Sequence, residues 1–336
     1  MLFHIPIEPY ETRYTADWVE QYERAFKDRG IVSETILGDQ TTSVLQPGCV
    51  LDACGTHIYK LSQLSKIIHR INSGRIKNND VIFFSDLWFP GIESLFYIRN
   101  MTKIDFKIVG VLHAGTYDQY DFTCQNGMRS WGAALERCWF NEFDMIFVAT
   151  AFHKHLIMEN TPICCKDKIK VTGLPFYAEE LRKRFPVTEK ENLVVFPHRI
   201  VPEKQPWLFD EIAKMPELSN FKFIYTMKDT TTRDEYFRLL AKSKIMLSFA
   251  GQETFGYSTL EAMALGNIAL VPNRLSYKET VPYEWRYDTF EELKLMLKGV
   301  LTGDIPQPLE GYPNLKYWAN SINRMLTELI SEGYNV

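Results

Sequence analysis

The chain has no apolar run that approaches the roughly 20 residues needed to span a bilayer. Its opening segment, residues 1–8, is too short and too acidic downstream to be a secretory signal. The net charge of −4 disfavours a protein that coats nucleic acid nonspecifically. We therefore expect a cytoplasmic protein without a membrane span, and nothing in the sequence specifies an oligomeric state.

No two of the six cysteines have the spacing that is typical of paired metal ligands. Cys164 and Cys165 are adjacent, which is unfavourable geometry for a disulfide, so we expect reduced thiols that mostly pack in the interior. His153 and His155 suggest a metal site, but they open a predicted helix, where residues two apart do not face each other. We therefore predict no metal site.

The 336 residues, 46% of them hydrophobic, are enough for two domains with sizeable cores. In the first half, apolar runs alternate with helical patterns, as in a parallel α/β sheet. The expected strands are 2–7, 31–37, 50–53, 81–84, 106–112, 145–149 and 169–172. The expected helices are 16–29, capped by Thr15, then 59–71, 131–139 and 153–159.

A charged segment, residues 174–191, contains Pro175 and Pro186 without sustained periodicity, so we expect the interdomain linker there. The second half repeats the alternation. Its expected strands are 192–197, 221–226, 245–249 and 268–272, and its expected helices are 234–242, 258–265 and a terminal helix 314–331. The predicted organisation is an N-terminal domain over 1–175, a C-terminal domain over 190–312, and a terminal segment over 313–336.

Two carboxylates, Glu253 and Glu261, bracket a Phe-Gly turn after the apolar run 244–249. Helical spacing resumes after the turn, so Gly256 to Ser258 should form a helix N-terminus, where unpaired N–H groups attract anions. Glu261 falls one turn inside that helix and Glu253 lies on the loop. The two acids can therefore reach opposite ends of one ligand, such as a nucleoside diphosphate sugar.

A second motif follows the predicted strand 192–197, where Arg199 and Lys204 come after the strand end. The carboxyl edge of an α/β sheet is where ligands bind in such folds. Two cations there suit a diphosphate, because Arg can grip phosphate oxygens bidentately and Lys acts as a point charge.

Arg199-x4-Lys204 followed by Glu253-x7-Glu261 resembles the retaining glycosyltransferases of the GT-B fold, the group that includes glycogen synthases. The resemblance covers about residues 190–282. It implies an α/β fold of two Rossmann-like domains whose parallel sheets face a central cleft, with the terminal helix crossing back to the first domain. The first domain departs from the pattern, because no glycine-rich loop follows its first strand.

The resemblance also implies roles for single residues. Arg199 and Lys204 would contact the donor diphosphate, Glu253 the donor sugar and Glu261 the ribose. By position, His113 would contact the transferred sugar, or it would only shape its own loop. The donor-binding set is completed by Phe255, Gly256, Tyr257, Ser258, Tyr225 and Met227.

The reaction implied is front-face displacement with retention, with no cofactor beyond the nucleotide sugar. A UDP-sugar is favoured by the family alone. No Asp-x-Asp arrangement lies near the donor motifs, so the sequence does not require a divalent metal.

Polar and aromatic residues follow three strands of the first domain and are our acceptor-binding candidates. Asp86 and Trp88 follow the strand 81–84, although Trp88 also suits a core position. The remaining candidates are Arg13 in the bulky loop after the first strand, and Tyr117 and Asp118 after His113.

The opening residues 5–18 and the segment 113–118 are similar to glycosyltransferases of tailed bacteriophages, some of which modify hydroxymethylated pyrimidines in DNA. This similarity implies 5-hydroxymethylcytosine in double-stranded DNA as acceptor, within the host cytoplasm. A basic cluster could contact phosphates, or it is a solvated helix end: Lys66, His69, Arg70, Arg75 and Lys77. The alternatives are a polysaccharide or lipid-linked saccharide acceptor, and a non-catalytic module that binds nucleotide sugars or DNA.

Overall fold

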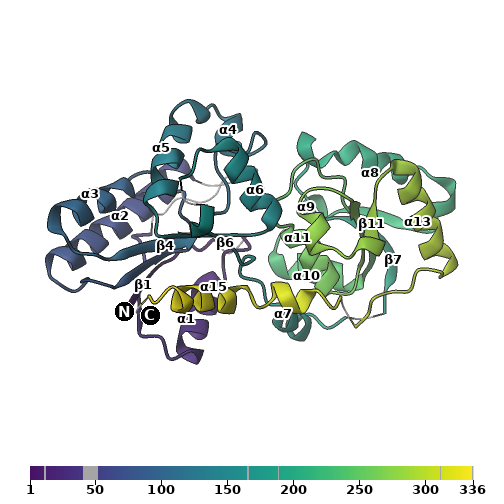
Figure 1. Cartoon of the computed structure of the whole chain (residues 1–336). Helices are drawn as coiled ribbons and strands as arrows, with labels where there is room; N and C mark the ends of the chain where they lie inside the picture. The colour runs from purple at the N-terminus through teal and green to yellow at the C-terminus, as the bar shows by residue number, and fades with distance from the viewer. Residues whose placement is uncertain (11–12, 41–51, 165, 188, 311, 335) are drawn as a thin grey trace. The chain divides into compact units, whose positions relative to one another are not determined.

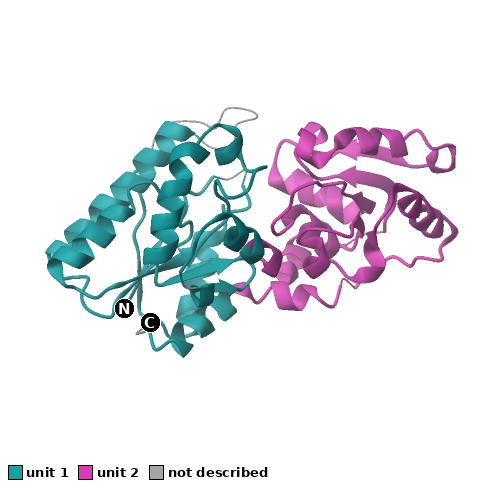
Figure 2. Ribbon diagram, turned by 45° about the horizontal axis from the view of Figure 1, so that its top comes forward, with its two compact units in different colours: residues 1–149, 154–174, 322–336 teal, residues 150–153, 175–321 magenta. Residues whose placement is uncertain are grey.

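The computed structural model describes residues 1–336 apart from 11–12, 41–51, 165, 188, 311 and 335. The chain divides into two compact units (Figure 2). Unit 1 contains residues 1–149, 154–174 and 322–336, and unit 2 contains 150–153 and 175–321. Each unit is built around one parallel sheet with its own apolar core.

The sheet of unit 1 has six strands in the order β2-β1-β3-β4-β5-β6 (Figure 1). The strands are β1 (Leu2–Ile5), β2 (Ser33–Thr35), β3 (Val81–Phe84), β4 (Lys107–Val111), β5 (Met145–Val148) and β6 (Ile169–Val171). Strand β1 pairs with both β2 and β3. The strand order therefore reverses between β1 and β3, and the loops that leave these two strands define a crevice at the carboxyl edge of the sheet.

The helices associated with unit 1 connect these strands. They are α1 (Trp18–Asp28), α2 (Ala53–Asn72), α3 (Glu93–Thr102), α4 (Phe122–Gln125), α5 (Arg129–Glu142), α6 (Ala151–Asn160), which begins with residues of unit 2, and α15 (Ser321–Ser331). The terminal helix α15 lies against α1 (Figure 1), where the Tyr22 hydroxyl is 3.6 Å from the Met325 sulfur and Arg29 bonds Asn323. Residues 322–336 thus complete the packing of unit 1.

The sheet of unit 2 has five strands in the order β11-β10-β9-β7-β8. They are β7 (Glu191–Phe196), β8 (Lys222–Tyr225), β9 (Ser243–Leu247), β10 (Ile268–Pro272) and β11 (Arg286–Tyr287). Its α-helices are α7 (Ala178–Arg184), α8 (Pro206–Ile212), α9 (Thr226–Asp229), α10 (Arg233–Lys242), α11 (Tyr257–Ala264), α12 (Tyr277–Thr280), α13 (Phe290–Thr302) and α14 (Leu315–Trp318). The order reverses between β7 and β9, so the loops after these strands form the crevice of unit 2.

The predicted α/β class and the alternation of strands and helices are confirmed, but several expected boundaries are wrong. Helix α1 begins at Trp18 rather than at residue 16, so its N-cap is Asp17 and not Thr15, whose buried hydroxyl makes no hydrogen bond to the helix. Residues 50–51 of the expected strand 50–53 lie outside the described residues. Ala53 opens α2 instead, where the Asp52 carboxylate accepts the Cys54 N–H.

The segment 174–191, expected to be a linker, contains helix α7, and from residue 175 onward it belongs to unit 2. Two apolar side chains hold it there, since Ala178 and Phe185 are buried. The expected terminal helix 314–331 is split into α14 and α15 at residues 319–320. The physical reason is that Trp318 packs on Phe255 in unit 2, whereas Met325 packs in unit 1.

Candidate functional site

The loop after β7 and the loop after β9 meet through Lys204 and Glu253 in unit 2. Lys204 is buried in the single turn η2 (Pro202–Lys204), and its Nζ donates to the Gln252 carbonyl at 2.5 Å and to Glu253 Oε2 at 3.2 Å. The other carboxylate oxygen, Glu253 Oε1, accepts the Gly256 N–H at 3.0 Å. Lys204 and Glu253, 49 residues apart in sequence, thus form one buried charged pair.

The charges of this pair are set by its surroundings. Burial opposes ionisation of Glu253, but Lys204, His198 and backbone hydrogen bonding lower its pKa overall. Burial lowers the pKa of His198 to about 3, so its imidazole is neutral at physiological pH. At neutral pH the pair is therefore an ammonium beside a carboxylate, with an uncharged imidazole next to them.

Helix α11 starts directly after this pair. Gly256, at its N-cap, has φ = 86°, a left-handed conformation that suits glycine. Ser258 in the first turn lies 3.2 Å from His198 Nδ1, which ties the start of α11 to the end of β7. Phe255 and Tyr257 serve packing instead, since Phe255 is buried and the Tyr257 hydroxyl donates to the Pro175 carbonyl.

The second acid of the motif, Glu261, lies in a separate cluster with α10. Its Oε2 accepts the Tyr236 hydroxyl at 2.8 Å, and its Oε1 is 3.5 Å from Arg233 Nη2. Burial raises the pKa of Glu261, and the bonds from Arg233 and Tyr236 oppose that rise. The Arg233 contact was missed from sequence, although its position one turn before Tyr236 places both on the same face of α10.

Three residues predicted to bind the sugar donor have surroundings other than the Lys204 and Glu253 pair. Arg199 is 53% exposed at its side chain and contacts Glu203 at 3.5 Å. The Tyr225 hydroxyl donates to Asp210 at 2.7 Å, and Met227 is exposed on α9. Arg199 follows β7, Tyr225 ends β8 and Met227 follows it, so all three lie at the carboxyl edge of the sheet that also carries the pair.

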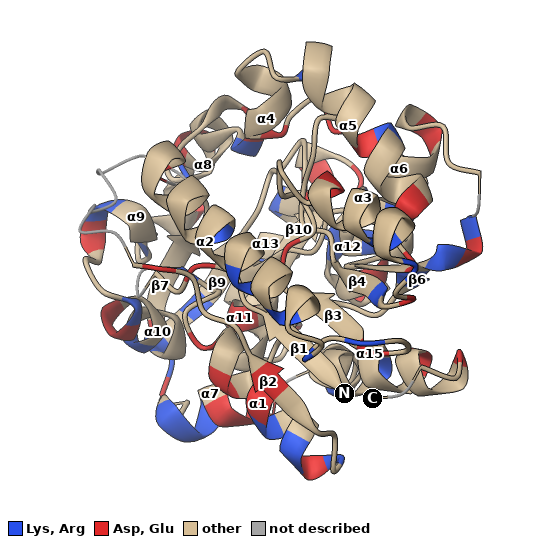
Figure 3. Ribbon diagram, turned by 90° about the vertical axis from the view of Figure 1, so that its left-hand side faces the viewer, with Lys and Arg blue, Asp and Glu red and all other residues tan. Residues whose placement is uncertain are grey.

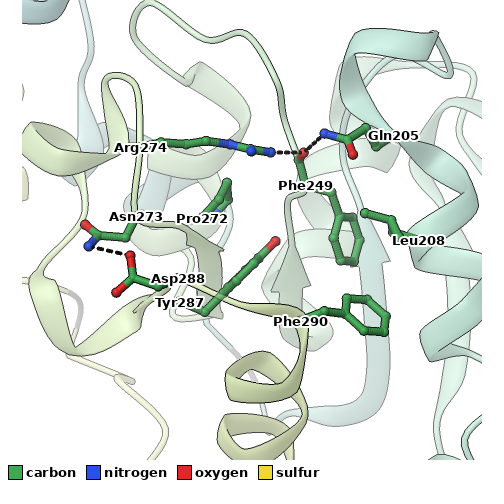
Figure 4. Close-up of a pocket in the computed structure, with 9 residues that line it drawn as sticks. All are labelled: Gln205, Leu208, Phe249, Pro272, Asn273, Arg274, Tyr287, Asp288 and Phe290. Carbon is green, nitrogen blue, oxygen red and sulfur yellow. Dashed lines mark hydrogen bonds between the residues drawn. The ribbon is translucent and has the colours of Figure 1, made fainter.

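A cavity of about 220 Å³ adjoins the loop that carries Glu253 (Figure 4). Gln205 Nε2 and Arg274 Nη2 both donate to the Phe249 carbonyl, at 2.8 and 3.0 Å, and Arg274 Nε donates to the Ala250 carbonyl. Gln205 directly follows Lys204. These bonds fix the backbone between β9 and Glu253, and nothing in the sequence pattern indicated them.

In unit 1 the loop after β3 is held by a buried ion pair. Lys60 Nζ, on α2, donates to Asp86 Oδ2 at 2.7 Å and to the Trp88 carbonyl at 2.8 Å. Asp86 Oδ1 accepts the Trp88 N–H. Lys60 was missed from sequence, yet it lies on the apolar stripe of α2 with Leu64 and Ile67, and a lysine on such a stripe signals a buried partner.

The loop after β1 approaches α2 through Glu8. Its carboxylate accepts the Thr56 hydroxyl at 2.7 Å, and the Tyr10 hydroxyl is 3.3 Å from the same oxygen of Thr56. The guanidinium of Arg13 lies 5.7 Å from the centre of the Tyr10 ring, a cation–π contact. At the strand-order reversal of unit 1, the two loops thus carry the carboxylates of Glu8 and Asp86 and the guanidinium of Arg13, and Lys60 reaches Asp86 from α2.

His113 is fixed by three neighbours. Its Nε2 is 2.7 Å from the Ser85 carbonyl and therefore carries the proton, while Nδ1 faces the Tyr14 hydroxyl at 3.4 Å. The ring stacks on Trp18. Burial lowers the pKa of His113, although Asp86 opposes the shift, so the ring is neutral near pH 7.

The predicted acceptor residues Tyr117 and Asp118 are buried. Tyr117 is 3% exposed and packs on Phe140 in the core, which is at odds with the acceptor-binding role predicted for it. Asp118 accepts the Tyr120 N–H and so shapes its own loop. Trp88, half-buried, donates its indole N–H to Glu136 on α5 at 2.8 Å.

Three residues of the predicted basic cluster form ion pairs. Lys66 pairs with Asp39, and Arg70 and Arg75 both pair with Glu34. Blue and red positions lie next to each other on several of the helices labelled in Figure 3. These pairs weaken the case that this cluster contacts nucleic-acid phosphates.

Among the described residues, no three His, Cys, Asp or Glu side chains come together in a way that could hold a metal ion. His155 instead pairs with Glu159, one turn along α6. In the same part of the chain, no helix combines the length and the apolar character needed to cross a membrane.

Replacing Asp86 by Asn should lower the free energy of unfolding by about 2 kcal/mol at neutral pH, because the buried Lys60 ammonium loses its counter-charge. Burial opposes ionisation of Asp86, but Lys60 and His113 lower its pKa overall. The stabilisation is therefore present above the unfolded-state pKa of about 3.9 and is lost as the pH falls through the lower folded-state value.

Urea unfolding of the Asp86→Asn variant measures this effect. The matched control is Asp39→Asn, which breaks the exposed pair with Lys66 and should cost less than about 0.5 kcal/mol. Equal losses in the two variants would contradict the assignment of a buried, structurally important pair to the loop after β3.

Comparison with known proteins identifies the fold of this chain. No family model matches the chain. The catalytic domain of starch synthase IV from Arabidopsis thaliana, solved with ADP and acarbose, superposes with a TM-score of 0.61 at 10% identity, covering 99% of this chain and 98% of that chain. The lipopolysaccharide outer core galactosyltransferase WaaB gives 0.61 at 12% identity, over 99% and 100%.

Sucrose-phosphate synthase from Thermosynechococcus elongatus gives a TM-score of 0.58 at 11% identity, over 99% of this chain and 94% of that chain. These matches extend over both units. Together with the two parallel sheets, they show that the chain has the GT-B fold of glycosyltransferases, as predicted. Identities this low show the fold alone, so the activity has to be argued from the site.

Proposed function

We propose that the protein is a retaining glycosyltransferase that takes its sugar from a nucleotide sugar. The observation that carries the proposal is the buried Lys204 and Glu253 pair at the start of α11, in the crevice of a GT-B-fold unit. An ammonium at the N-terminal end of a helix suits a diphosphate, and a carboxylate next to it suits sugar hydroxyls.

The proposed reaction uses few protein groups. The bond between the sugar C1 and the diphosphate oxygen breaks, the acceptor oxygen bonds C1 on the same face, and the acceptor proton passes to the departing oxygen. Lys204 and the start of α11 stabilise the negative charge that grows on the diphosphate. Arg199, exposed at the rim, reaches the same phosphates by swinging away from Glu203.

The other residues position the two substrates. Glu261, oriented by Tyr236 and Arg233, accepts ribose hydroxyls. Tyr225, the last residue of β8, and Met227, on α9, would contact the base. In unit 1, we place neutral His113 against the transferred sugar, where a sugar hydroxyl would replace the Tyr14 hydroxyl at Nδ1. UDP is the favoured nucleotide, and no cofactor beyond the donor is part of the proposal.

For the acceptor we propose 5-hydroxymethylcytosine in double-stranded phage DNA, on the similarity of residues 5–18 and 113–118 to phage enzymes. Arg13 and Trp88 are the residues of unit 1 best suited to phosphate and base contacts, since both are partly exposed. Mass spectrometry of nucleosides from hydroxymethylcytosine-containing duplex, incubated with the protein and a panel of nucleotide sugars, tests the acceptor. A pentose or hexose increment is expected.

A carbohydrate acceptor is the second candidate, and the ion pairs of the basic cluster favour it. The buried carboxylates Glu8 and Asp86 suit hydroxyl groups rather than phosphates. Unmodified DNA together with released nucleoside diphosphate would support glycosyltransferase activity and exclude DNA as the acceptor. A polysaccharide or lipid-linked saccharide would then be the favoured acceptor. Absence of any donor turnover would favour a non-catalytic binding module.

A further inference from the structure

The backbone carbonyls at the carboxyl end of α11, residues 262–265, all accept hydrogen bonds. The backbone N–H groups of Gly266 and Asn267 donate hydrogen bonds to the carbonyls of Met263 and Ala262, respectively. Two carbonyls remain, those of Ala264 and Leu265, and both residues are fully buried. Buried carbonyls at a helix end need donors, because an unpaired polar group away from water is destabilising.

Both donors are cations from the segment that the sequence presented as a linker. Arg182 Nη1, on α7, donates to the Ala264 carbonyl at 3.1 Å, and Lys190 Nζ donates to the Leu265 carbonyl at 2.6 Å. Charge at this place is more than capping requires, because a neutral amide or hydroxyl would satisfy a carbonyl equally well.

Lys190 is well matched to its surroundings. Its ammonium has three N–H donors, and its Nζ donates to three carbonyls, those of Leu265 and, at the end of α10, Leu240 and Ala241 at 3.3 and 2.9 Å. Helices α10 and α11 are the two that hold the Glu261 cluster. Burial lowers the pKa of Lys190 to about 7, so the full charge is present below neutral pH.

We infer that Arg182 and Lys190 are positioning residues that strengthen phosphate binding at the opposite end of α11. The inference rests on the proposed function, which places the donor diphosphate at the start of that helix. A helix carries partial negative charge at its carboxyl end, and two cations there offset it. The eight residues of α11 span only about 12 Å, and the helix is buried, so water screens the effect little.

The test separates phosphate recognition from general loosening of the fold. Equilibrium dialysis at about pH 6, below the Lys190 pKa, gives the dissociation constants of UDP and of uridine, and likewise of ADP and adenosine and of GDP and guanosine. The variants are Arg182→Gln and Lys190→Met. Lys190→Arg keeps the charge, and Lys183→Met removes an exposed charge from the same helix as Arg182.

We expect each neutralising variant to bind the preferred diphosphate about three- to tenfold more weakly while its nucleoside affinity is unchanged. Lys190→Arg and Lys183→Met should bind like the unaltered protein. If Lys190→Met does not fold, Arg182→Gln alone carries the test, since its side chain is only half-buried.

Parallel losses for diphosphate and nucleoside would show a structural role only and overturn the inference. Unchanged diphosphate binding in the folded variants would overturn it as well, while leaving the proposed function intact. If the unaltered protein binds none of the three diphosphates, the proposed function fails first and the inference with it.

Discussion

Replacing Lys204 by Ala is expected to lower turnover of the nucleotide sugar by about 10²- to 10³-fold, the usual cost of removing one preorganised charge stabiliser. Lys204 is buried, and its Nζ is held between the Gln252 carbonyl and Glu253. It therefore needs no reorganisation when negative charge grows on the leaving diphosphate. Release of nucleoside diphosphate at saturating donor measures the effect.

The control for this experiment is Lys298→Ala, which removes an exposed charge from α13. It should leave turnover unchanged. A melting temperature for each variant separates loss of catalysis from loss of fold. Near-normal turnover of Lys204→Ala at saturating donor would remove Lys204 from the mechanism, and with it the observation on which the proposed function rests.

Replacing Glu261 by Ala should raise the KM for the nucleotide sugar by about 10- to 100-fold, because hydrogen bonds to a carboxylate contribute about 1.5–3 kcal/mol. Turnover at saturating donor should change little, since Glu261 lies in the α10 cluster rather than beside Lys204. Steady-state kinetics with varied donor concentration give both constants.

Tyr236→Phe is the matched variant, because it removes one bond to Glu261 and keeps the ring. A several-fold increase in KM is expected if the carboxylate must be oriented by that hydroxyl. A lower turnover number with an unchanged KM in Glu261→Ala would contradict the assignment of Glu261 to ribose binding.

The fold was predictable where local signals agreed. Strand β10 has the predicted bounds, 268–272, because a short apolar run there follows Gly266-Asn267 and ends at Pro272. Helix α7 was not predicted, since five of its seven residues are charged and the segment between the two prolines shows no apolar periodicity. What holds α7 in place is tertiary packing of Ala178 and Phe185, and no local pattern encodes that packing.

The sequence predicted the motifs of the site but not the contacts that its residues make. Order and spacing placed Lys204 and Glu253 at strand ends, and the reversal of strand order between β7 and β9 explains why they meet. Lys60 and Glu136 were missed, because their partners lie 26 and 48 residues away in sequence. Burial also separated residues that looked alike, so that Trp88 stays partly exposed while Tyr117 enters the core.

The most direct test of the central claim is proton NMR of the sugar released when the protein is incubated with UDP-glucose and other nucleotide sugars of known anomeric configuration. We expect release of nucleoside diphosphate together with a sugar that first appears in the anomeric configuration of the donor. Release of the opposite anomer would contradict the retaining mechanism, and failure to consume any donor would contradict the assignment of the Lys204 and Glu253 crevice as a glycosyltransferase site.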